Sequence, residues 1–412
     1  MTYRFLLYAP QDATDVANEL GRSDYSYWFV LNYFRPMLEG LGEVVVLSSP
    51  DQQPAPTDAS DLLLLFMPPH TIPLDLAEHA IPVFAWEYTT IPSESWAGEP
   101  RNDWREILSR APGAITHSRF AADAVRAAMG TDYPVTSLPA PVWDRYAPLA
   151  AQPQPPDCRL TFTGAVIDSA RVGLTQGPDH PQPDTTPGRH ELTLSGVIYT
   201  SVVNPNDGRK VWEDTITAFV WAHKDNPDAT LVLKLVHFDK DTAVGIVWDF
   251  MRRLAPYRCR IVALHSYLPT EQFQQLMAGS TFVVNSSRGE GQCLPLMEFM
   301  SAGVPAIAPD HTAMAEYVHD RDALVVASSA EWTHWPHDPR RFLRCLMHPV
   351  TWDSLRAAFV AGQRIATEDP RRYEHMRESA SATLRTHCSQ EVIRAGMARF
   401  LSDLPERTTG TH

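Results

Sequence analysis

The chain of 412 residues lacks several features that mark whole classes of protein. It has no excess of positive charge: the 35 Lys and Arg are outnumbered by 49 Asp and Glu, and the net charge is −14. This balance argues against nucleic acid or an anionic membrane as the main partner. It is still compatible with a local basic pocket that binds a small anion. The longest unbroken apolar run, Leu62 to Met67, has six residues, whereas a membrane span requires about 20. Residues 1–30 carry no signal-peptide pattern, so we expect a cytoplasmic protein.

Cysteine and glycine are also scarce. The five cysteines are an odd number without a Cys-x-x-Cys pair, so they indicate neither a disulfide scaffold nor a structural zinc site. The 20 glycines against 35 prolines predict loops punctuated by proline. Asp320-Arg-Asp322 has the letters of a metal-binding Asp-x-Asp but lies in a polar stretch, and neither His-Glu-x-x-His nor a phosphate-binding P-loop occurs. We therefore expect no metal.

Short apolar segments alternate with amphipathic stretches through most of the chain. Six strand-like segments precede residue 140, with helix-like stretches at 25–41 and 119–129 among them, and the alternation returns over 192–328. Apolar strands that alternate with helices indicate parallel sheets covered on both faces. We predict an α/β protein of two doubly wound domains that face each other across a cleft, since open α/β sheets bind ligands at the carboxyl ends of their strands.

The alternation fails in one place, and this sets the predicted domain boundaries. We predict an N-terminal domain at 1–150, a proline-rich linker or surface excursion at 151–192, and a C-terminal domain at 193–385. The excursion contains one short strand-like segment, residues 159–166.

The most informative stretch covers residues 281–309. A strand runs into a loop at 286–294, and Pro295 stands where a helix can begin, because the missing N–H of proline costs nothing at that position. The loop and helix-start amides can then face an anion. Glu290 lies in the loop, and we place Glu298 in the first helical turn. Two carboxylates beside an anion site suit a nucleotide-sugar, which has phosphates and vicinal hydroxyls; a solvated Glu290 and a Glu298 that complements the helix dipole are the alternative interpretation.

The pattern of this stretch, S-x-G-E-G-x-x-L-P-x-x-E-x-x-x-x-G-x-P, resembles the signature of family-four retaining glycosyltransferases, which belong to the GT-B group related to glycogen synthase. The matching positions are Glu290, Gly291, Leu294, Pro295, Glu298, Met300, Gly303 and Pro305.

Three further segments resemble the same family. Residues 208–219 resemble its "K-G-x-x-x-L-I-x-A-F" helix, which places Lys210 on the family's phosphate-binding lysine. Residues 115–148 resemble the end of its N-terminal domain. Residues 383–404 resemble its C-terminal helices, the last of which crosses back onto the first domain, so we assign 386–412 to that helix and a tail.

The resemblance implies the GT-B fold and transfer of a glycosyl group with retention of the anomeric configuration. It implies that Glu290 holds the hydroxyls of the donor sugar and Glu298 those of the ribose. Backbone amides of Gly291, Gln292, Cys293 and Leu294 would take sugar and phosphate oxygens. Lys210 is the first choice to stabilise the charge on the leaving diphosphate.

Four further residues are candidates for donor binding, and three of them have a structural alternative. Arg209 is either a second phosphate cation or a solvated neighbour. Lys234 interrupts an apolar strand, and since a buried lysine needs a partner, it pairs with the diphosphate or with an internal carboxylate. Asn204 supplies amide donors or shapes a turn. Tyr267 lies in the loop at 265–268, where the family often seats the nucleobase.

The sequence also departs from the family pattern. Gln292 and Cys293 replace a Phe-Gly pair, which reshapes the sugar pocket. Trp86-Glu87 stands where many members carry a histidine, so Glu87 is a candidate catalytic residue that contacts the acceptor or the donor sugar, unless it makes a structural hydrogen bond.

We therefore predict an enzyme that uses a nucleotide-diphospho-sugar as co-substrate, with no other cofactor. It would glycosylate a saccharide or lipid-linked saccharide in surface polysaccharide assembly, and a peripheral contact with the inner face of a membrane stays open. The alternatives are a nucleotide-sugar epimerase of the same fold and a non-catalytic sugar-binding protein.

Overall fold

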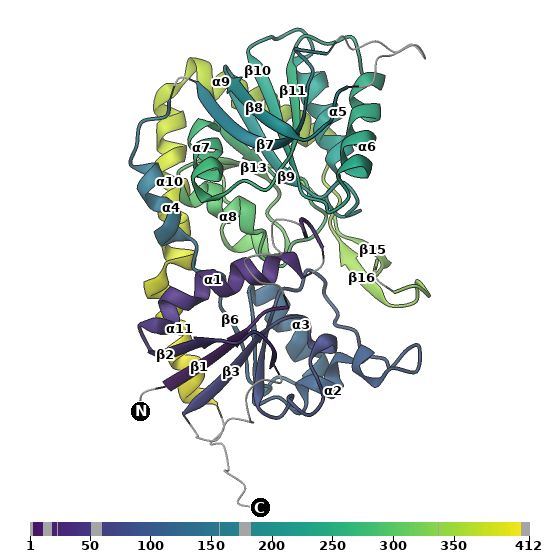
Figure 1. Ribbon diagram of the computed structural model, residues 1–412, viewed down its shortest axis with the longest axis vertical. Helices are drawn as coiled ribbons and strands as arrows, with labels where there is room; N and C mark the ends of the chain where they lie inside the picture. Colours follow the sequence, from purple (N-terminus) through teal and green to yellow (C-terminus); the bar gives the residue numbers. More distant parts are fainter. Residues whose placement is uncertain are drawn as a thin grey trace, which may run out of the picture.

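The computed structural model describes residues 3–10, 19–22, 24–50, 60–155, 157–172, 183–336 and 338–404. Parts of the predicted excursion and all of the predicted tail beyond residue 404 lie outside this description. The described chain forms two α/β halves, one above the other along the long axis of Figure 1, and α1 lies at the junction between them.

The N-terminal half is built on a six-stranded parallel sheet of order β2-β1-β3-β4-β5-β6, as predicted. Its central strand β3 (Asp61–Phe66) is buried along its whole length because helices or loops cover both faces. The other elements are β1 (Tyr3–Tyr8), α1 (Tyr25–Glu39), β2 (Gly42–Val46), β4 (Ala80–Phe84), α2 (Trp104–Leu108), β5 (Ala114–Thr116), α3 (Arg119–Met129), β6 (Val135–Ser137) and α4 (Trp143–Ala150), with short 3-10 turns at Pro69–Thr71 and Pro100–Asn102.

The C-terminal half holds an eight-stranded sheet of order β14-β13-β12-β9-β10-β11-β7-β8. Its first six strands in this order are parallel, which confirms the second doubly wound sheet. The elements are β9 (Val197–Val203), α5 (Trp212–His223), β10 (Ala229–Leu235), α6 (Lys240–Arg253), β11 (Arg260–His265), α7 (Thr270–Gly279), β12 (Phe282–Val284), α8 (Leu294–Ser301), β13 (Ala306–Ala308), a 3-10 turn at Thr312–Glu316, β14 (Ala323–Val325) and α9 (Trp352–Glu368).

Residues 151–192 differ from the predicted linker. They contribute β7 (Cys158–Asp168), which pairs antiparallel with β11, and most of β8 (Gly188–Leu194), which pairs antiparallel with β7. Buried and exposed residues alternate along β7, so one face packs against the domain core. The prolines of this segment had suggested a loop, but the hairpin extends the C-terminal sheet at its edge.

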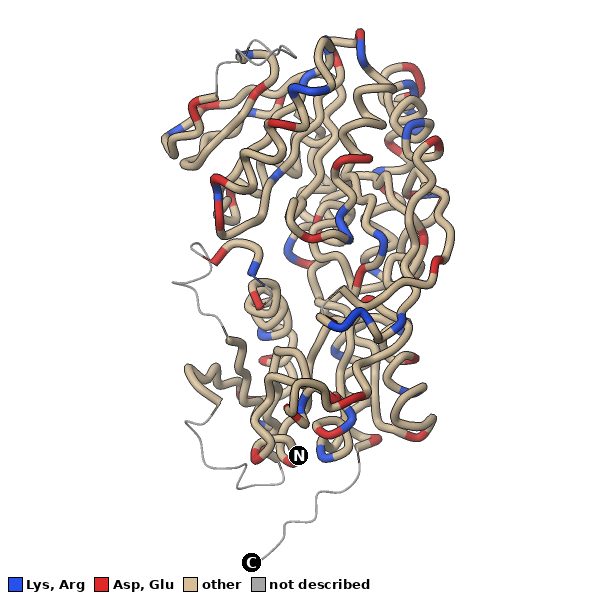
Figure 2. The backbone as a smooth tube through the Cα atoms, turned by 90° about the vertical axis from the view of Figure 1, so that its right-hand side faces the viewer, with Lys and Arg blue, Asp and Glu red and all other residues tan. Residues whose placement is uncertain are grey.

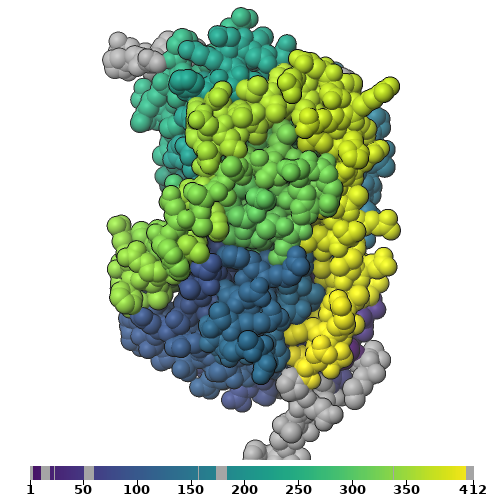
Figure 3. Space-filling view, turned by 180° about the vertical axis from the view of Figure 1, so that it is seen from behind, coloured from purple at the N-terminus to yellow at the C-terminus, as the bar shows by residue number. Residues whose placement is uncertain are grey.

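A second hairpin follows the last parallel strand of the C-terminal half. Strands β15 (Glu331–His334) and β16 (Arg344–Met347) pair antiparallel and project from the C-terminal half over the N-terminal half (Figure 3). The Thr90 hydroxyl donates to the Arg344 carbonyl at 2.8 Å, and Arg340 pairs with Glu94 at 3.0 Å. The hairpin therefore bridges the two halves.

The C-terminal helices also join the halves. α10 (Pro370–Cys388) runs down one side of the molecule, and α11 (Gln390–Asp403) continues onto the N-terminal half (Figures 1 and 3). A Cβ atom added at Gly396 of α11 would lie 2.6 Å from Leu138, so this helix packs closely against the N-terminal half. The predicted return of the C-terminal helix is confirmed.

Figure 2 shows Lys and Arg interspersed with Asp and Glu along the described backbone of both halves. Among the described residues, no helix combines the length and the apolar character that a membrane crossing needs.

Candidate functional site

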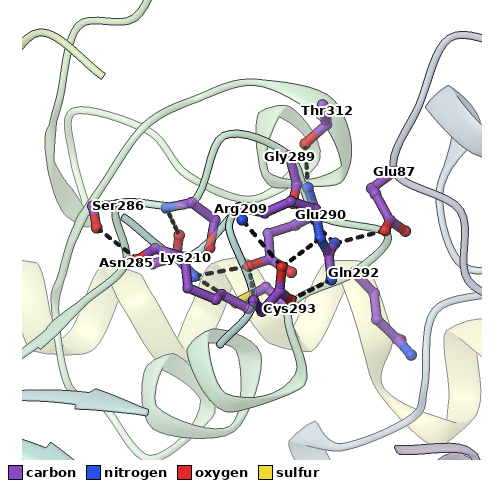
Figure 4. A network of polar contacts seen from close by, with 12 residues as sticks. Glu87, Arg209, Lys210, Asn285, Ser286, Gly289, Glu290, Gln292, Cys293 and Thr312 are labelled. Carbon is purple, nitrogen blue, oxygen red and sulfur yellow. Dashed lines mark hydrogen bonds and ion pairs between the residues drawn. The ribbon is translucent and has the colours of Figure 1, made fainter. Parts of the chain in front are cut away.

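The carboxyl ends of β9 and β12 bring two distant loops together. The strands are neighbours in the parallel sheet, so the loops that follow them leave the same edge of the sheet. The first loop carries Arg209 and Lys210, and the second carries Glu290, 80 positions after Lys210. Figure 4 shows these side chains converging from the two loops, with Glu87 facing them from the N-terminal half.

Lys210 and Glu290 form a buried ion pair. The Lys210 Nζ lies 2.5 Å from the Glu290 Oε1, and the Asn285 side-chain amide donates to the same oxygen at 3.2 Å. Burial by itself raises the pKa of Glu290, but the Lys210 ammonium and the Arg209 guanidinium outweigh burial and lower it. Burial likewise disfavours the charged form of Lys210, yet Glu290 raises the pKa of the lysine above its usual value. The pair is therefore ionised.

Arg209 is held from both halves of the molecule. Its guanidinium binds Asp207 with two hydrogen bonds, at 3.1 and 2.7 Å, and its Nη1 lies 2.7 Å from the Glu87 Oε1. Burial raises the pKa of Glu87 and outweighs the opposing effect of Arg209, while the nearby Glu290 adds to the rise. Three carboxylates and two cations thus share one small volume.

The start of α8 lies beside this cluster, since the Asn285 side chain contacts both Glu290 and Cys293. Its N-cap residue, Cys293, has the left-handed conformation, with φ of 58°, and makes no side-chain capping hydrogen bond within the described part of the chain. Pro295 lies in the first turn, as expected, although the helix begins one residue earlier, at Leu294. Pro295 has no N–H to offer, and the Leu296 amide faces the Cys293 sulfur, so the amide at this helix start that an anion can use is that of Leu294.

Glu298 lies in the second turn of α8, because the helix begins at Leu294; the predicted first-turn position is wrong. A capping role is excluded by this position. Its carboxylate accepts a hydrogen bond of 2.5 Å from the Tyr33 hydroxyl, which α1 of the N-terminal half supplies. Burial raises the pKa of Glu298 to about 7, against the opposing effects of Tyr33, Arg145 and Lys234.

Lys234 is buried, as its place in an apolar strand predicted, with 5% of its surface exposed. Among the described residues, its ammonium has neither a hydrogen bond nor an ion pair. Burial lowers its pKa to about 8, and the Glu298 carboxylate opposes this fall. No carboxylate of the described residues therefore touches the Lys234 ammonium. A diphosphate as its partner stays a prediction.

Several candidate residues contact the N-terminal half. The Gln292 side-chain oxygen accepts from the Ala140 amide at 3.1 Å, and the Asn204 side chain donates to the Gly21 carbonyl at 3.1 Å. A Cβ atom at Gly291 would lie 2.9 Å from the Trp86 nitrogen, so this position requires glycine. These residues join the two halves, and a donor-binding role for them stays a prediction.

The remaining candidates lie around the helix start. Cys293 is buried, its sulfur accepts a hydrogen bond from Asn285 at 3.0 Å, and burial raises its thiol pKa, so it is not an activated nucleophile. Leu294 is buried as the first residue of α8. Tyr267 is half-buried. Burial raises the pKa of the Tyr25 hydroxyl of α1, and both Tyr267 and Glu298 lie near enough to add to this rise.

Sequence reasoning missed three residues of the site. Asp207 orients Arg209. The one feature of the sequence that could have indicated this role is its position two residues before Arg209 in the same loop. Tyr33 of α1 is buried, and its hydroxyl binds Glu298. The Thr312 hydroxyl accepts from the Glu290 amide at 3.1 Å and comes from a turn more than 20 residues away, so no local pattern could indicate it.

Residues 248–334, which include Glu290 and Glu298 but not Lys210, match the model of a family described as glycosyl transferases group 1. No curated protein matches the sequence.

Several solved structures are similar to this chain. Anabaena Alr3699/HepE in complex with UDP and glucose is 14% identical, with a TM-score of 0.58 over 98% of this chain and 100% of its own. A glycosyltransferase from Rickettsia africae ESF-5 is 11% identical, with a TM-score of 0.57 over 98% and 100%. The pneumococcal O-GlcNAc transferase GtfA, in complex with UDP and GlcNAc, is 14% identical, with a TM-score of 0.50 over 84% of this chain; the chain spans 57% of that longer protein. These similarities confirm the predicted GT-B fold.

Proposed function

We propose that this protein is a retaining glycosyltransferase, which moves a sugar from a nucleotide-diphospho-sugar to a hydroxyl of a saccharide or lipid-linked saccharide. The observation that carries the proposal is the meeting of Lys210 with the buried Glu290 at the start of α8, with Arg209 and its partner Glu87 beside them. The match of residues 248–334 to group 1 glycosyl transferases supports sugar transfer by this half.

The site contains a complementary group for each part of such a donor. The Leu294 amide at the start of α8, with Lys210 and Arg209, suits the diphosphate. Glu290, once the diphosphate competes for Lys210, can accept hydrogen bonds from the sugar hydroxyls. Glu298 lies one helical turn further along α8, where its second carboxylate oxygen can accept from the ribose.

The transfer follows from these positions. The bond between the anomeric carbon and the diphosphate oxygen breaks, and the acceptor oxygen forms its bond on the same face of the sugar. The acceptor proton passes to the departing phosphate oxygen. Negative charge grows on the diphosphate as the bond breaks, so the fixed cations Lys210 and Arg209 lower the barrier. No metal is part of this proposal.

Glu87 is the third proposed catalytic residue. Its carboxylate reaches across the cleft to Arg209, at the place where the sugar end of the donor would lie beside Glu290. When the diphosphate takes Arg209, Glu87 becomes free to contact the donor sugar or the acceptor hydroxyl. We place the reaction in surface polysaccharide synthesis in the cytoplasm, with the inner face of the membrane as the site of any lipid-linked acceptor.

Thermal stabilisation by UDP-, GDP- and dTDP-sugars, followed by product analysis, tests the proposal. A donor raises the melting temperature according to its affinity, and sugar transfer to an added saccharide should then stop in Glu290→Ala. Donor exchange or hydrolysis without an acceptor product would favour the epimerase instead. Donor binding with no turnover in the wild type would indicate the non-catalytic protein.

A further inference from the structure

Lys234 is a buried cation that the proposed chemistry does not use. It lies in β10 between β9 and β11, opposite Val202 and Leu264 in the register of the two pairs. Side chains alternate between the faces of a strand, and Leu233 and Leu235 pack in the core cluster on the other face. Lys234 therefore points to the same side as Val232, which packs in the cluster that includes α8.

The cations near the two glutamates of the site fall into two groups. Lys210 and Arg209 lower the pKa of Glu290, whereas Arg145 and Lys234 oppose the rise in the pKa of Glu298. Glu298 is four residues beyond the start of α8, about 6 Å along the helix axis at 1.5 Å per residue. Lys210 and Arg209 are thus the cations near Glu290, where we place the diphosphate. Lys234 belongs to the surroundings of Glu298, where we place the ribose.

The strand next to Lys234 leads into the loop at 266–269. The His265 Nε2 lies 2.6 Å from the His237 carbonyl, which ties the end of β11 to the segment that follows β10. If Glu298 holds the ribose, the base attached to that ribose lies toward this loop. Lys234 pairs with Leu264, so it lies one position before the end of β10 and beside the strand that leads into this loop.

We propose that Lys234 reads the nucleobase of the donor by donating a hydrogen bond from its Nζ to a ring carbonyl oxygen. This inference rests on the proposed function. It selects uracil, thymine, guanine or cytosine over adenine, which has no ring carbonyl. A buried ammonium without an acceptor is costly, so the site disfavours the base that leaves it unpaired. At neutral pH the lysine is largely protonated, because its lowered pKa is still about 8.

The test compares UDP, GDP and ADP, which share the diphosphate and the ribose, in the wild type and in Lys234→Met. Calorimetry should show that the wild type prefers UDP or GDP to ADP. In Lys234→Met, affinity for the preferred nucleotide should fall about 10- to 100-fold, while affinity for ADP changes less than about threefold. The exposed Lys224, changed to Met, is the matched control and should leave the preference unchanged.

The outcomes separate the possible roles. An equal loss for all three nucleotides would make Lys234 a diphosphate contact and overturn the inference. Lys234→Met should also melt at a higher temperature than the wild type, because it removes a buried charge; a lower melting temperature with an unchanged nucleotide preference would show a structural role. If the wild type binds none of the three nucleotides and transfers no sugar, the proposed function itself fails.

Discussion

Lys210 and Arg209 each pair with a buried carboxylate, and this pairing sets the energetics of donor binding at the residue scale. A diphosphate at the start of α8 must compete with Glu290 for Lys210 and with Glu87 and Asp207 for Arg209. In the proposed function, the same exchange releases Glu290 for the sugar hydroxyls. The ion pairs would then keep the cations in position and couple diphosphate binding to sugar binding.

Lys210→Met should slow transfer strongly and destabilise the fold. Loss of a fixed cation that stabilises the leaving group costs about 100- to 1000-fold in kcat. Glu290 is then left buried without its cation, which costs about 3 kcal/mol of unfolding free energy. The double variant Lys210→Met with Glu290→Gln removes the uncompensated charge and should recover most of that stability but no activity. Urea unfolding and initial rates check both parts; a double variant as unstable as Lys210→Met would contradict the ion-pair argument.

The pKa of Glu298 predicts a pH dependence. Burial raises it from 4.5 to about 7, so between these values the folded protein holds a proton that the unfolded chain has released. The contribution of this group to stability is therefore complete below about pH 4.5 and is lost as the pH rises through 7. Glu298→Gln has no titrating group at this position, so it does not lose this stability as the pH rises. The unfolding free energy of the variant minus that of the wild type should therefore be about 3 kcal/mol larger at pH 8 than at pH 4.5. Urea unfolding at the two pH values measures this, and an equal difference at both would contradict it.

At the scale of single elements, the helix starts at the cleft carry strained backbone. Val211 precedes α5 with φ of 29°, a conformation that β-branched residues rarely adopt. Cys293 precedes α8 in the left-handed region. The first of these positions corresponds to the glycine of the "K-G" pattern that the 208–219 segment resembles, so the strain lies next to the proposed phosphate lysine.

Val211→Gly should relieve this strain. Glycine adopts positive φ without the Cβ penalty of about 1–2 kcal/mol, and its greater freedom in the unfolded chain offsets part of the gain. We expect the variant to be as stable as the wild type or more stable by up to about 1 kcal/mol. Val220→Gly, at a buried site inside the same helix, should instead cost about 3 kcal/mol or more because it leaves a cavity and lowers helix propensity. Thermal melts compare the two, and similar losses in both would argue against strain at Val211.

At the scale of the whole molecule, the two halves are joined by the hairpin β15–β16, by α11 and by polar contacts at their junction. Four such contacts are Tyr33 to Glu298, Glu87 to Arg209, Asn204 to Gly21 and Gln292 to Ala140. Two of these contacts involve groups that we assign to the donor. In the proposed function, donor binding therefore competes with these contacts between the halves.

Glu87→Gln should strengthen nucleotide binding. The variant removes one negative charge from the volume that receives a diphosphate and leaves Arg209 paired with Asp207, so affinity for UDP should rise several-fold while transfer slows if Glu87 is catalytic. Glu94→Gln is the matched control, because that carboxylate also bridges the halves, to Arg340, but is partly exposed at the hairpin. It should change affinity little. Unchanged or weaker UDP binding in Glu87→Gln, by calorimetry, would contradict the competition.

The sequence by itself determined the two parallel sheets and the burial of Lys234, because apolar periodicity shows which segments are buried strands. The family resemblance implied that Lys210 and Glu290 act on one donor, but the strand order of the folded sheet is what brings their two loops to the same edge. It did not reveal that β7 and β8 extend the second sheet or that 331–347 forms a hairpin, since proline-rich and mixed patterns do not specify long-range pairing. Only the tertiary structure decided that Tyr33, Glu87, Asn204 and Gln292 make contacts between the halves. These partners lie far apart in the chain, and their meeting depends on how two separately patterned domains pack.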